Sequence, residues 1–311
     1  MTLVVEDRHF LGVMGVKMKI KLFEKDVTLA DHHCNFNDTN GQKIKEPYIN
    51  LYVKITDVCQ AKCEFCEFCK DEGTVFDYYK FLYTFVRLNS QIKINKVSFT
   101  GGEPTLKIDL LNKLLKEVKE INPEIFTVVN TNGYKFTQIN PDYVDSIALS
   151  RHHAEDHKNA EIFKTKFVPS WSDINSYKHK EKLHLSCNLI KGYVDSKDEC
   201  YEHIIFYGGI GITDIGFVSL MGVNQYAKDH FIDFDEVQLD KMKNTLKSQA
   251  WAKNYDNKTV CKCSNYLTYN SRGDIVKSYA RYYVDRTECK SILVYQENKL
   301  RAGFDGEIIV E

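Results

Sequence analysis

The stretch YINLYVKITDVCQAKCEFC, residues 48–66, decides which fold class the sequence predicts. Residues 48–55 form a nearly continuous run of apolar, β-branched and aromatic side chains, which predicts a buried strand. A short loop follows this strand directly and carries Cys59, Cys63 and Cys66. Reactive side chains just after a buried strand are expected at the functional end of a β/α unit.

Strand and helix patterns alternate through the following residues. Strands are expected at 96–99, 125–130, 146–150, 184–190 and 214–221, and helices at 75–88, 109–121, 155–166 and 195–207. In the first helix the spacing places Val75, Tyr79, Leu82 and Val86 on one face. Such alternation predicts parallel strands joined by right-handed crossovers. We predict an α/β fold, a partial (β/α)6 TIM-like barrel, with a doubly wound open sheet as the alternative.

The pattern changes after residue 223. An amphipathic helix is expected at 231–249, and turns with short strands at 271–311. We therefore expect three parts: a β-rich N-terminal extension over 1–47, a barrel core over 48–223, and a small cysteine-containing C-terminal appendage over 224–311.

The composition narrows the class of protein. The 311 residues include 42 Lys+Arg and 43 Asp+Glu, with 43% hydrophobic residues, which excludes a disordered chain. The net charge of −1 disfavours a nucleic-acid partner. There is no apolar run of the ~20 residues that span a membrane, and no signal-peptide pattern. We expect a cytoplasmic protein with reduced cysteines, which are candidates for metal ligands before disulfides.

The cysteine loop is the strongest chemical signal. Three thiolates on one short loop can hold three corners of a [4Fe–4S] cube and leave its fourth iron open to another ligand. Two alternatives remain: a structural zinc site completed by Cys69, and a ferredoxin-type site on Cys63, Cys66 and Cys69. The zinc ligands would be crowded, and the ferredoxin pattern fails because no Cys-Pro follows at the required spacing.

A second motif follows the strand at 96–99. The sequence FTGGEPTL, residues 99–106, places Gly101 and Gly102 where backbone can approach a ligand closely. Glu103 adds a carboxylate at the C-terminal end of a barrel strand, where ligands bind.

Together the two motifs resemble those of the radical S-adenosylmethionine (radical SAM) superfamily. The cluster loop matches at Cys59, Cys63, Phe65 and Cys66, and the glycine motif at Gly101, Gly102, Glu103 and Pro104, within a resemblance that covers roughly 48–223. The resemblance implies a [4Fe–4S] cluster on the three cysteines and SAM on the open iron. One electron then cleaves SAM to methionine and a 5′-deoxyadenosyl radical, which abstracts a substrate hydrogen.

The resemblance also implies SAM contacts. The backbone of Phe65 is expected against the adenine, and the segment from Gly101 to Glu103 at the SAM amino group. The remaining expected contacts are Thr131 and Asn132 for the methionine carboxylate or ribose, Ser150 as a polar contact, and Asn188 at the ribose.

The segment SRHHAEDH, residues 150–157, lies just beyond a predicted strand. Arg151 and His152 are candidates to bind a carboxylate or to serve as acid and base. The alternative is a polar helix start, in which Glu155 and Asp156 lie near the positive end of the helix dipole.

The C-terminal cysteines begin at CKC, residues 261–263. Nine residues separate Cys263 from Gly273, as at the opening of the SPASM and twitch auxiliary-cluster appendages that the sequence resembles. Those appendages continue with a cysteine where Ser278 stands here. A second iron–sulfur cluster, a hydrogen-donating thiol and buried small side chains are three open interpretations. The cluster would draw its ligands from Cys261, Cys263 and Cys289, with Cys69 or Cys34 as a fourth.

The sequence thus predicts a radical SAM enzyme of the molybdenum-cofactor cyclase and SPASM/twitch type. We expect a peptide substrate, with epimerisation, cross-linking or oxidation as the outcome, because the appendage resembles those of peptide-modifying members. A small molecule (nucleotide, sugar or amino acid) is the alternative substrate. An electron donor such as flavodoxin or ferredoxin is expected as a partner. The non-enzymatic alternative is an electron carrier or a zinc-binding module.

Overall fold

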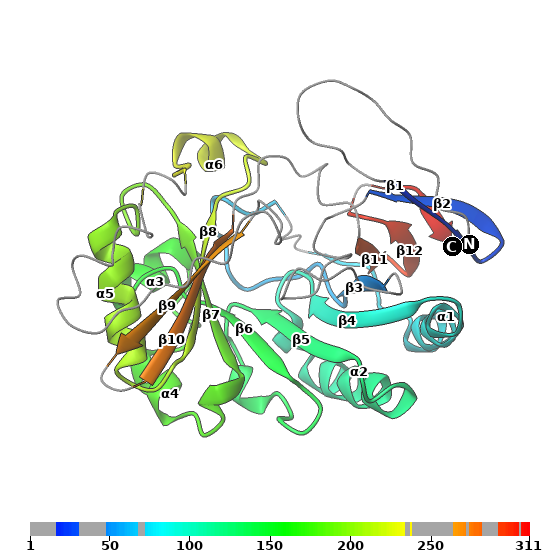
Figure 1. Ribbon diagram of the computed structural model, residues 1–311, viewed down its shortest axis with the longest axis horizontal. Coiled ribbons are helices and arrows are strands. Elements are labelled where there is room, and N and C mark those ends of the chain that lie inside the picture. Colours follow the sequence, from blue (N-terminus) through cyan, green and yellow to red (C-terminus); the bar gives the residue numbers. More distant parts are fainter. Residues whose placement is uncertain are drawn as a thin grey trace.

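The computed structural model describes residues 17–30, 48–67, 72–233, 237, 264–271, 274–281, 292–304 and 306–311. One sheet of eleven strands runs through it in the order β13-β12-β11-β3-β4-β5-β6-β7-β8-β10-β9 (Figure 1). A separate antiparallel hairpin pairs β1 (Lys17–Leu22) with β2 (Lys25–Ala30).

The centre of the sheet is parallel. Its strands are β3 (Tyr48–Lys54), β4 (Lys93–Thr100), β5 (Phe126–Thr131), β6 (Ser146–Ser150), β7 (Leu183–Leu189) and β8 (Asp214–Ser219). Each pairs in parallel with the next. The connecting helices are α1 (Tyr78–Gln91), α2 (Ile108–Ile121), α3 (Asp156–Phe163), α4 (Trp171–Ser176) and α5 (Lys197–Gly208). The predicted α/β fold of the partial TIM-like barrel type is confirmed, and the described strands do not close the barrel.

The strands alternate between an apolar and a polar face. In β7 the side chains of Leu183, Leu185 and Leu189 are buried, whereas His184 and Ser186 belong to the opposite face. The apolar face packs into the main core, to which α1, α2 and α5 also contribute, and these helices lie outside the curved sheet (Figure 1). The alternation leaves polar side chains on the inner face of the sheet.

Strands from the C-terminal part of the chain extend the sheet at both ends. β11 (Ile292–Gln296) pairs in parallel with β3 and continues into β12 (Lys299–Ala302) and β13 (Ile308–Val310). At the other end, β10 (Asp274–Arg281) pairs in parallel with β8 and antiparallel with β9 (Ser264–Ser271). Segments far apart in sequence thus form one sheet, and the predicted division at residues 47 and 223 stays a prediction.

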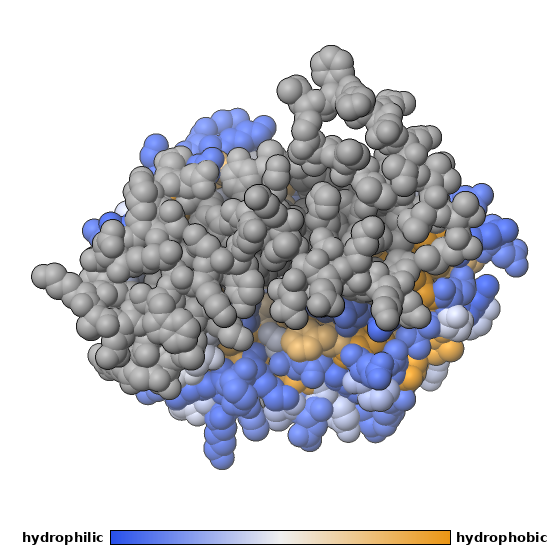
Figure 2. Space-filling view, viewed as in Figure 1, coloured by the Kyte–Doolittle hydropathy of each residue, from blue (hydrophilic) through white to orange (hydrophobic). Residues whose placement is uncertain are grey.

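The face of α1 that carries Tyr79 and Val86 is not the face that packs into the core. Val75 and Tyr79 are 86% and 79% exposed, and the helix packs instead through Phe81, Phe85 and Leu88. The helix begins after Asp77, whose side chain caps it, and it carries apolar side chains around most of its circumference. Spacing alone therefore does not select the packed face. Apolar side chains reach the surface in this region of Figure 2.

Two other helices differ from the expectation. α4 was not predicted, although its capping box between Ser170 and Asp173 is visible in the sequence. The expected helix at 231–249 falls mostly outside the described residues, and a short helix α6 (Gln225–Asp229) precedes it. Within the described part of the chain, every helix is too short or too polar to cross a membrane.

Candidate active site

The cysteine loop follows the C-terminal end of β3 directly. Cys59 is buried, whereas Cys63 and Cys66 are half-buried. The Cys66 N–H donates to the Cys63 carbonyl oxygen (3.1 Å), which closes a turn between these two residues. The Lys62 N–H donates to the carbonyl oxygen of Phe163 (3.0 Å), so the end of α3 anchors the loop.

The glycine-rich turn after β4 packs against the residues that precede the cysteines. The Gly102 N–H donates to the Thr56 carbonyl oxygen (2.7 Å), and the Glu103 N–H to the Val58 carbonyl oxygen (2.9 Å). A Cβ at Gly102 would lie 2.2 Å from the Val58 oxygen, and one at Gly101, where φ is +148°, 2.2 Å from the Thr56 oxygen. The close packing of the two loops therefore requires glycine at both positions, independently of any ligand.

Glu103 is fully buried and its carboxylate is used inside the protein. It accepts hydrogen bonds from the Thr105 N–H (2.9 Å) and hydroxyl (2.6 Å), the Thr131 hydroxyl (2.6 Å) and the Asn132 N–H (2.7 Å). Burial raises the pKa of Glu103 above its ordinary value, and these hydrogen bonds oppose the rise. The predicted SAM-binding role of this segment therefore narrows to the backbone of Gly101 and Gly102.

The side chain of Asn132 supports the cysteine loop. Its amide N–H donates to Cys59 Sγ (3.6 Å), and its Oδ1 accepts from Gln60 Nε2 (3.0 Å) and from the Tyr134 N–H (3.1 Å). The side chains of Asn132 and Thr131 are thus engaged inside the protein, and their predicted SAM contacts stay a prediction.

Arg151 does not reach a ligand site. Its side chain is 1% exposed, and the guanidinium donates to Tyr207 Oη, to the Pro169 carbonyl (2.8 Å), to the Ala154 carbonyl (3.0 Å) and to Asp156. In this structure the side chain fixes the segment after β6, and the predicted binding of a carboxylate of SAM or substrate stays a prediction.

His152 is also buried, at 3% exposure. Its Nδ1 accepts from the Asn188 backbone N–H (3.0 Å), and its ring lies edge-on to Phe65 and stacks on Phe163. Burial, and then the neighbouring Arg151, lower the pKa of His152 to about 3. Burial thus disfavours the charged imidazole and one ring nitrogen is occupied inside the protein, while the predicted acid–base role stays a prediction.

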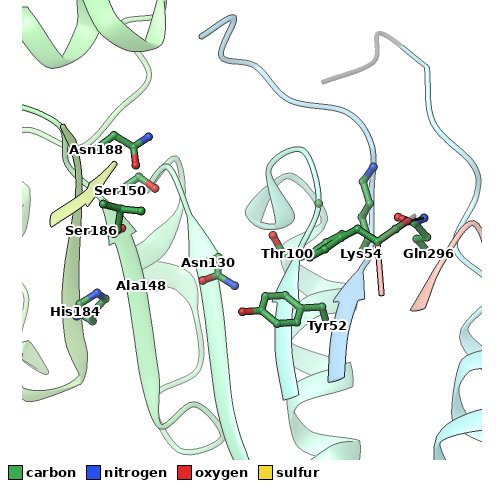
Figure 3. A pocket seen from close by; sticks show the side chains of 13 residues that line it. Tyr52, Lys54, Thr100, Asn130, Ala148, Ser150, His184, Ser186, Asn188 and Gln296 are labelled. Atoms are coloured by element: carbon green, nitrogen blue, oxygen red, sulfur yellow. Dashed lines mark hydrogen bonds between the residues drawn. The ribbon is translucent and has the colours of Figure 1, made fainter. Parts of the chain in front are cut away.

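A cavity of about 280 Å³ opens along the inner face of the sheet (Figure 3). Thr100, Gly101, Ser150 and Asn188 line the part nearest the ends of their strands. The rest of the polar lining comes from several strands: Tyr52, Lys54, Asn130, His184, Ser186 and Gln296. Lys54 pairs with Thr100 and Ser186 with Ser150, so these side chains lie level with the first group. In Figure 3 the side chains of Tyr52 and Asn130 point toward one another across the cavity. Barrel interiors are usually filled by branched apolar residues, so a polar hollow indicates a ligand site.

The structure brings only some of the predicted residues to this cavity. Gly101, Ser150 and Asn188 line it. Phe65 packs beside His152, and Pro104 is buried at the start of the 3-10 helix Pro104–Lys107. The sequence analysis did not predict the other polar lining residues. The alternation of faces in β3 and β7 could have placed Lys54, Tyr52, His184 and Ser186 on the inner face of the sheet. No sequence signal indicates Gln296, because its place depends on the pairing of β11 with β3.

The donor set of the loop fits an iron–sulfur cluster. Burial, together with the neighbouring thiols of Cys66 and Cys59, raises the pKa of Cys63 to about 12. Three soft sulfur ligands gathered out of water suit a cationic iron centre. Among the described residues there is no group of three side chains that could hold a single metal ion. A cube spreads its thiolates over three irons.

Several predicted ligands lie outside the described residues. They are Cys34, Cys69, Cys261, Cys263 and Cys289. The second cluster, the alternative thiol role and the zinc site completed by Cys69 therefore stay predictions. Ser278 lies in β10, at the position where the SPASM pattern would have a cysteine.

Comparison with known proteins identifies the family. Residues 53–154 match the radical SAM superfamily. The GTP 3′,8-cyclase of Aquifex aeolicus is 24% identical over 213 residues, which are 63% of this chain and 64% of that protein. A protein of Thermococcus kodakarensis named "Probable GTP 3′,8-cyclase" is 32% identical over 100 residues, 30% of each chain. The chain spans less than two thirds of the length of both relatives.

Solved structures share the fold. Streptococcus suis SuiB bound to S-adenosylmethionine aligns with a TM-score of 0.51 and 18% identity, over 63% of this chain and 47% of that one. SuiB bound to its precursor peptide SuiA aligns with a TM-score of 0.50 and 19% identity, over 63% and 45%. Residues 53–154 therefore form a radical SAM domain, and this family combines a [4Fe–4S] cluster with SAM, the two cofactors that the sequence predicts.

Proposed function

We propose that the chain cleaves SAM reductively at a cluster held by Cys59, Cys63 and Cys66 and removes a hydrogen atom from a small polar substrate in the cavity. The observation that carries this proposal is the continuity of the two sites. β3 contributes Tyr52 to the cavity and leads directly into the cysteine loop. The turn that supports the loop also contributes Gly101 to the cavity.

The residues divide the work by position. Cys59, Cys63 and Cys66 would hold the cube, and Asn132 would donate a hydrogen bond to one of its thiolates. Gly101, Ser150 and Asn188 would contact SAM, with Phe65 at the adenine. When bound, the reduced cluster supplies the electron that splits SAM into methionine and a 5′-deoxyadenosyl radical. The chain's own task is to hold SAM and substrate together and to keep water from the reacting atoms.

The cavity favours a small polar molecule over a peptide. Its lining offers the amides of Asn130 and Gln296 and the phenol of Tyr52, which can bind the hydrogen-bonding groups of a compact ligand. Tyr52 and the ring of Phe304, 5.5 Å apart, add an aromatic wall. The predicted peptide substrate rests on C-terminal cysteines outside the described residues. A flavodoxin or ferredoxin as electron donor and a cytoplasmic location also stay predictions.

The proposed function predicts stimulated SAM cleavage. The anaerobic, cluster-loaded protein, reduced with dithionite and given SAM, should release 5′-deoxyadenosine slowly. A cell extract filtered to remove proteins and long peptides should accelerate this release, and protease treatment of the extract should not matter. The Asn130→Leu variant should keep the slow release and lose the acceleration, because it removes a hydrogen-bonding group from the cavity.

The outcomes separate the substrate classes. If only the fraction that the filter retains accelerates the release of 5′-deoxyadenosine, and protease treatment abolishes this effect, the substrate is a peptide and the small-molecule proposal is overturned. Absence of 5′-deoxyadenosine from the loaded, reduced protein would overturn the reaction itself. Asn175→Leu, an exchange of the same kind on α4, is the matched control and should behave as the unaltered protein.

The hydrogen bond from Asn132 to Cys59 predicts a redox effect. A donor at a thiolate sulfur stabilises the more negatively charged, reduced cluster. Asn132→Leu removes the donor, so the midpoint potential should become more negative, and Asn132→Asp should shift it further by adding a negative charge. A redox titration followed by electron paramagnetic resonance measures both. An unchanged potential in the two variants would contradict the assigned contact.

A second cluster is tested by metal content. The unaltered chain should hold about four irons if the first loop alone binds a cluster, and about eight if Cys261, Cys263 and Cys289 bind another. In the second case Cys263→Ala should lower the count.

A further inference from the structure

His152 connects the two sides of the proposed SAM site. It follows β6 directly, and its Nδ1 accepts from the backbone N–H of Asn188 on β7 (3.0 Å). Because Nδ1 is the acceptor, the proton of the neutral imidazole lies on Nε2. The hydrogen bond holds the β7 backbone at the residue whose side chain lines the cavity.

The same ring supports the cysteine loop. The His152 and Phe65 rings meet edge to face, with centroids 5.5 Å apart at 77°. On the other side, the ring stacks on Phe163 at 4.8 Å and 24°. Phe163 also accepts the backbone hydrogen bond from Lys62 of the loop (3.0 Å). One buried ring therefore lies between the loop, the end of α3 and the β7 backbone.

The position of His152 is fixed locally. Its own N–H donates to Asn159 Oδ1 (2.9 Å), and the preceding Arg151 N–H donates to the Ser186 carbonyl oxygen (2.9 Å). The buried Arg151 guanidinium holds the following segment through Ala154. A ring held from both ends of its segment does not need to reorganise when a ligand binds.

We propose that His152 is a positioning residue that fixes Phe65 and Asn188 relative to one another and so shapes the adenosine end of the SAM site. This inference rests on the proposed function. It replaces the acid–base role with a geometric one: the imidazole accepts one hydrogen bond and presents a flat face and an edge to two aromatic rings.

Two variants separate the two contacts. His152→Phe keeps an aromatic ring and loses the acceptor, whereas His152→Asn keeps an acceptor and loses the ring. Each variant loses one buried hydrogen bond or one aromatic pair, so each should weaken SAM binding by about two- to tenfold. Equilibrium dialysis of the cluster-loaded protein with labelled SAM measures this, independently of turnover. At saturating SAM, kcat should change much less than KM.

A double-mutant cycle tests the contact itself. If His152 acts through Phe65, Phe65→Leu combined with His152→Asn should weaken SAM binding by less than the product of the two separate effects. His157→Gln is the matched control, because this neighbouring histidine is exposed and pairs only loosely with Glu155 (3.4 Å). It should leave the SAM dissociation constant unchanged.

The outcomes are distinct from those of the proposed function. Unchanged SAM affinity in both His152 variants, with normal iron content, would overturn the inference while leaving the reaction in place. If the unaltered protein holds its cluster but binds no SAM, the proposed function fails first. If a His152 variant loses its iron, the Phe163→Leu variant is tested in its place, because it removes the stacking partner and keeps His152. The same dialysis then measures its SAM binding, which should be weaker than that of the unaltered protein.

Discussion

Replacing Cys63 with alanine is expected to remove nearly all the iron that the anaerobically loaded protein holds. The substitution removes one of the three thiolates that hold the cube and leaves two. The unaltered protein should contain about four irons and an equal amount of sulfide per cluster. The Cys63→Ala variant should show neither, and should form no 5′-deoxyadenosine.

A matched control is available in the core. Cys200 is fully buried on α5, away from the loop, and behaves as a small apolar side chain. Cys200→Ala should retain the full iron content. If Cys63→Ala retains its iron while Cys200→Ala loses it, the cluster has been assigned to the wrong thiols.

Replacing Gly102 with alanine is expected to destabilise the site severely. The added Cβ would lie 2.2 Å from the carbonyl oxygen of Val58, and also 2.7 Å from that of Asp57. Backbone atoms do not yield as side chains do, so the two loops must separate. We expect a loss of at least about 3 kcal/mol in the free energy of unfolding, together with loss of iron.

The control for this substitution is Gly222. A Cβ there would meet only the flexible side chain of Lys228, at 3.4 Å, and its backbone is not in the left-handed region. Gly222→Ala should leave thermal stability and iron content nearly unchanged. A Gly102→Ala protein that melts as the unaltered one does would show that the packing of the two loops is not as described.

The central fold follows from the sequence because local pattern decides it. The parallel strands are short apolar runs, as in β5 with Val129 or β6 with Ile147 and Leu149, and helical patterns separate most of them. The pairing of β11 with β3 does not follow, because it joins residues more than two hundred positions apart in the sequence. The packed face of α1 does not follow from the sequence either, because Phe81 and Tyr79 are both apolar enough to be buried.

The sequence predicts those site residues whose function depends on the type of side chain more than on its partners in the fold. Three cysteines at close spacing indicate metal binding wherever the chain takes them. A polar residue such as Glu103 or Asn132 is ambiguous, because its partner decides whether it meets a ligand or another side chain. Both turned out to be engaged inside the protein. His152 combined both difficulties, since burial removed its charge and folding supplied a partner from β7.

The most direct test of the central claim is the electron paramagnetic resonance spectrum of the reduced, anaerobically loaded protein with and without SAM. An iron left without a protein ligand should bind the amino and carboxylate groups of SAM, and the signal should change on addition. A spectrum that SAM leaves unaltered, or a first loop that holds zinc in place of iron, would contradict it.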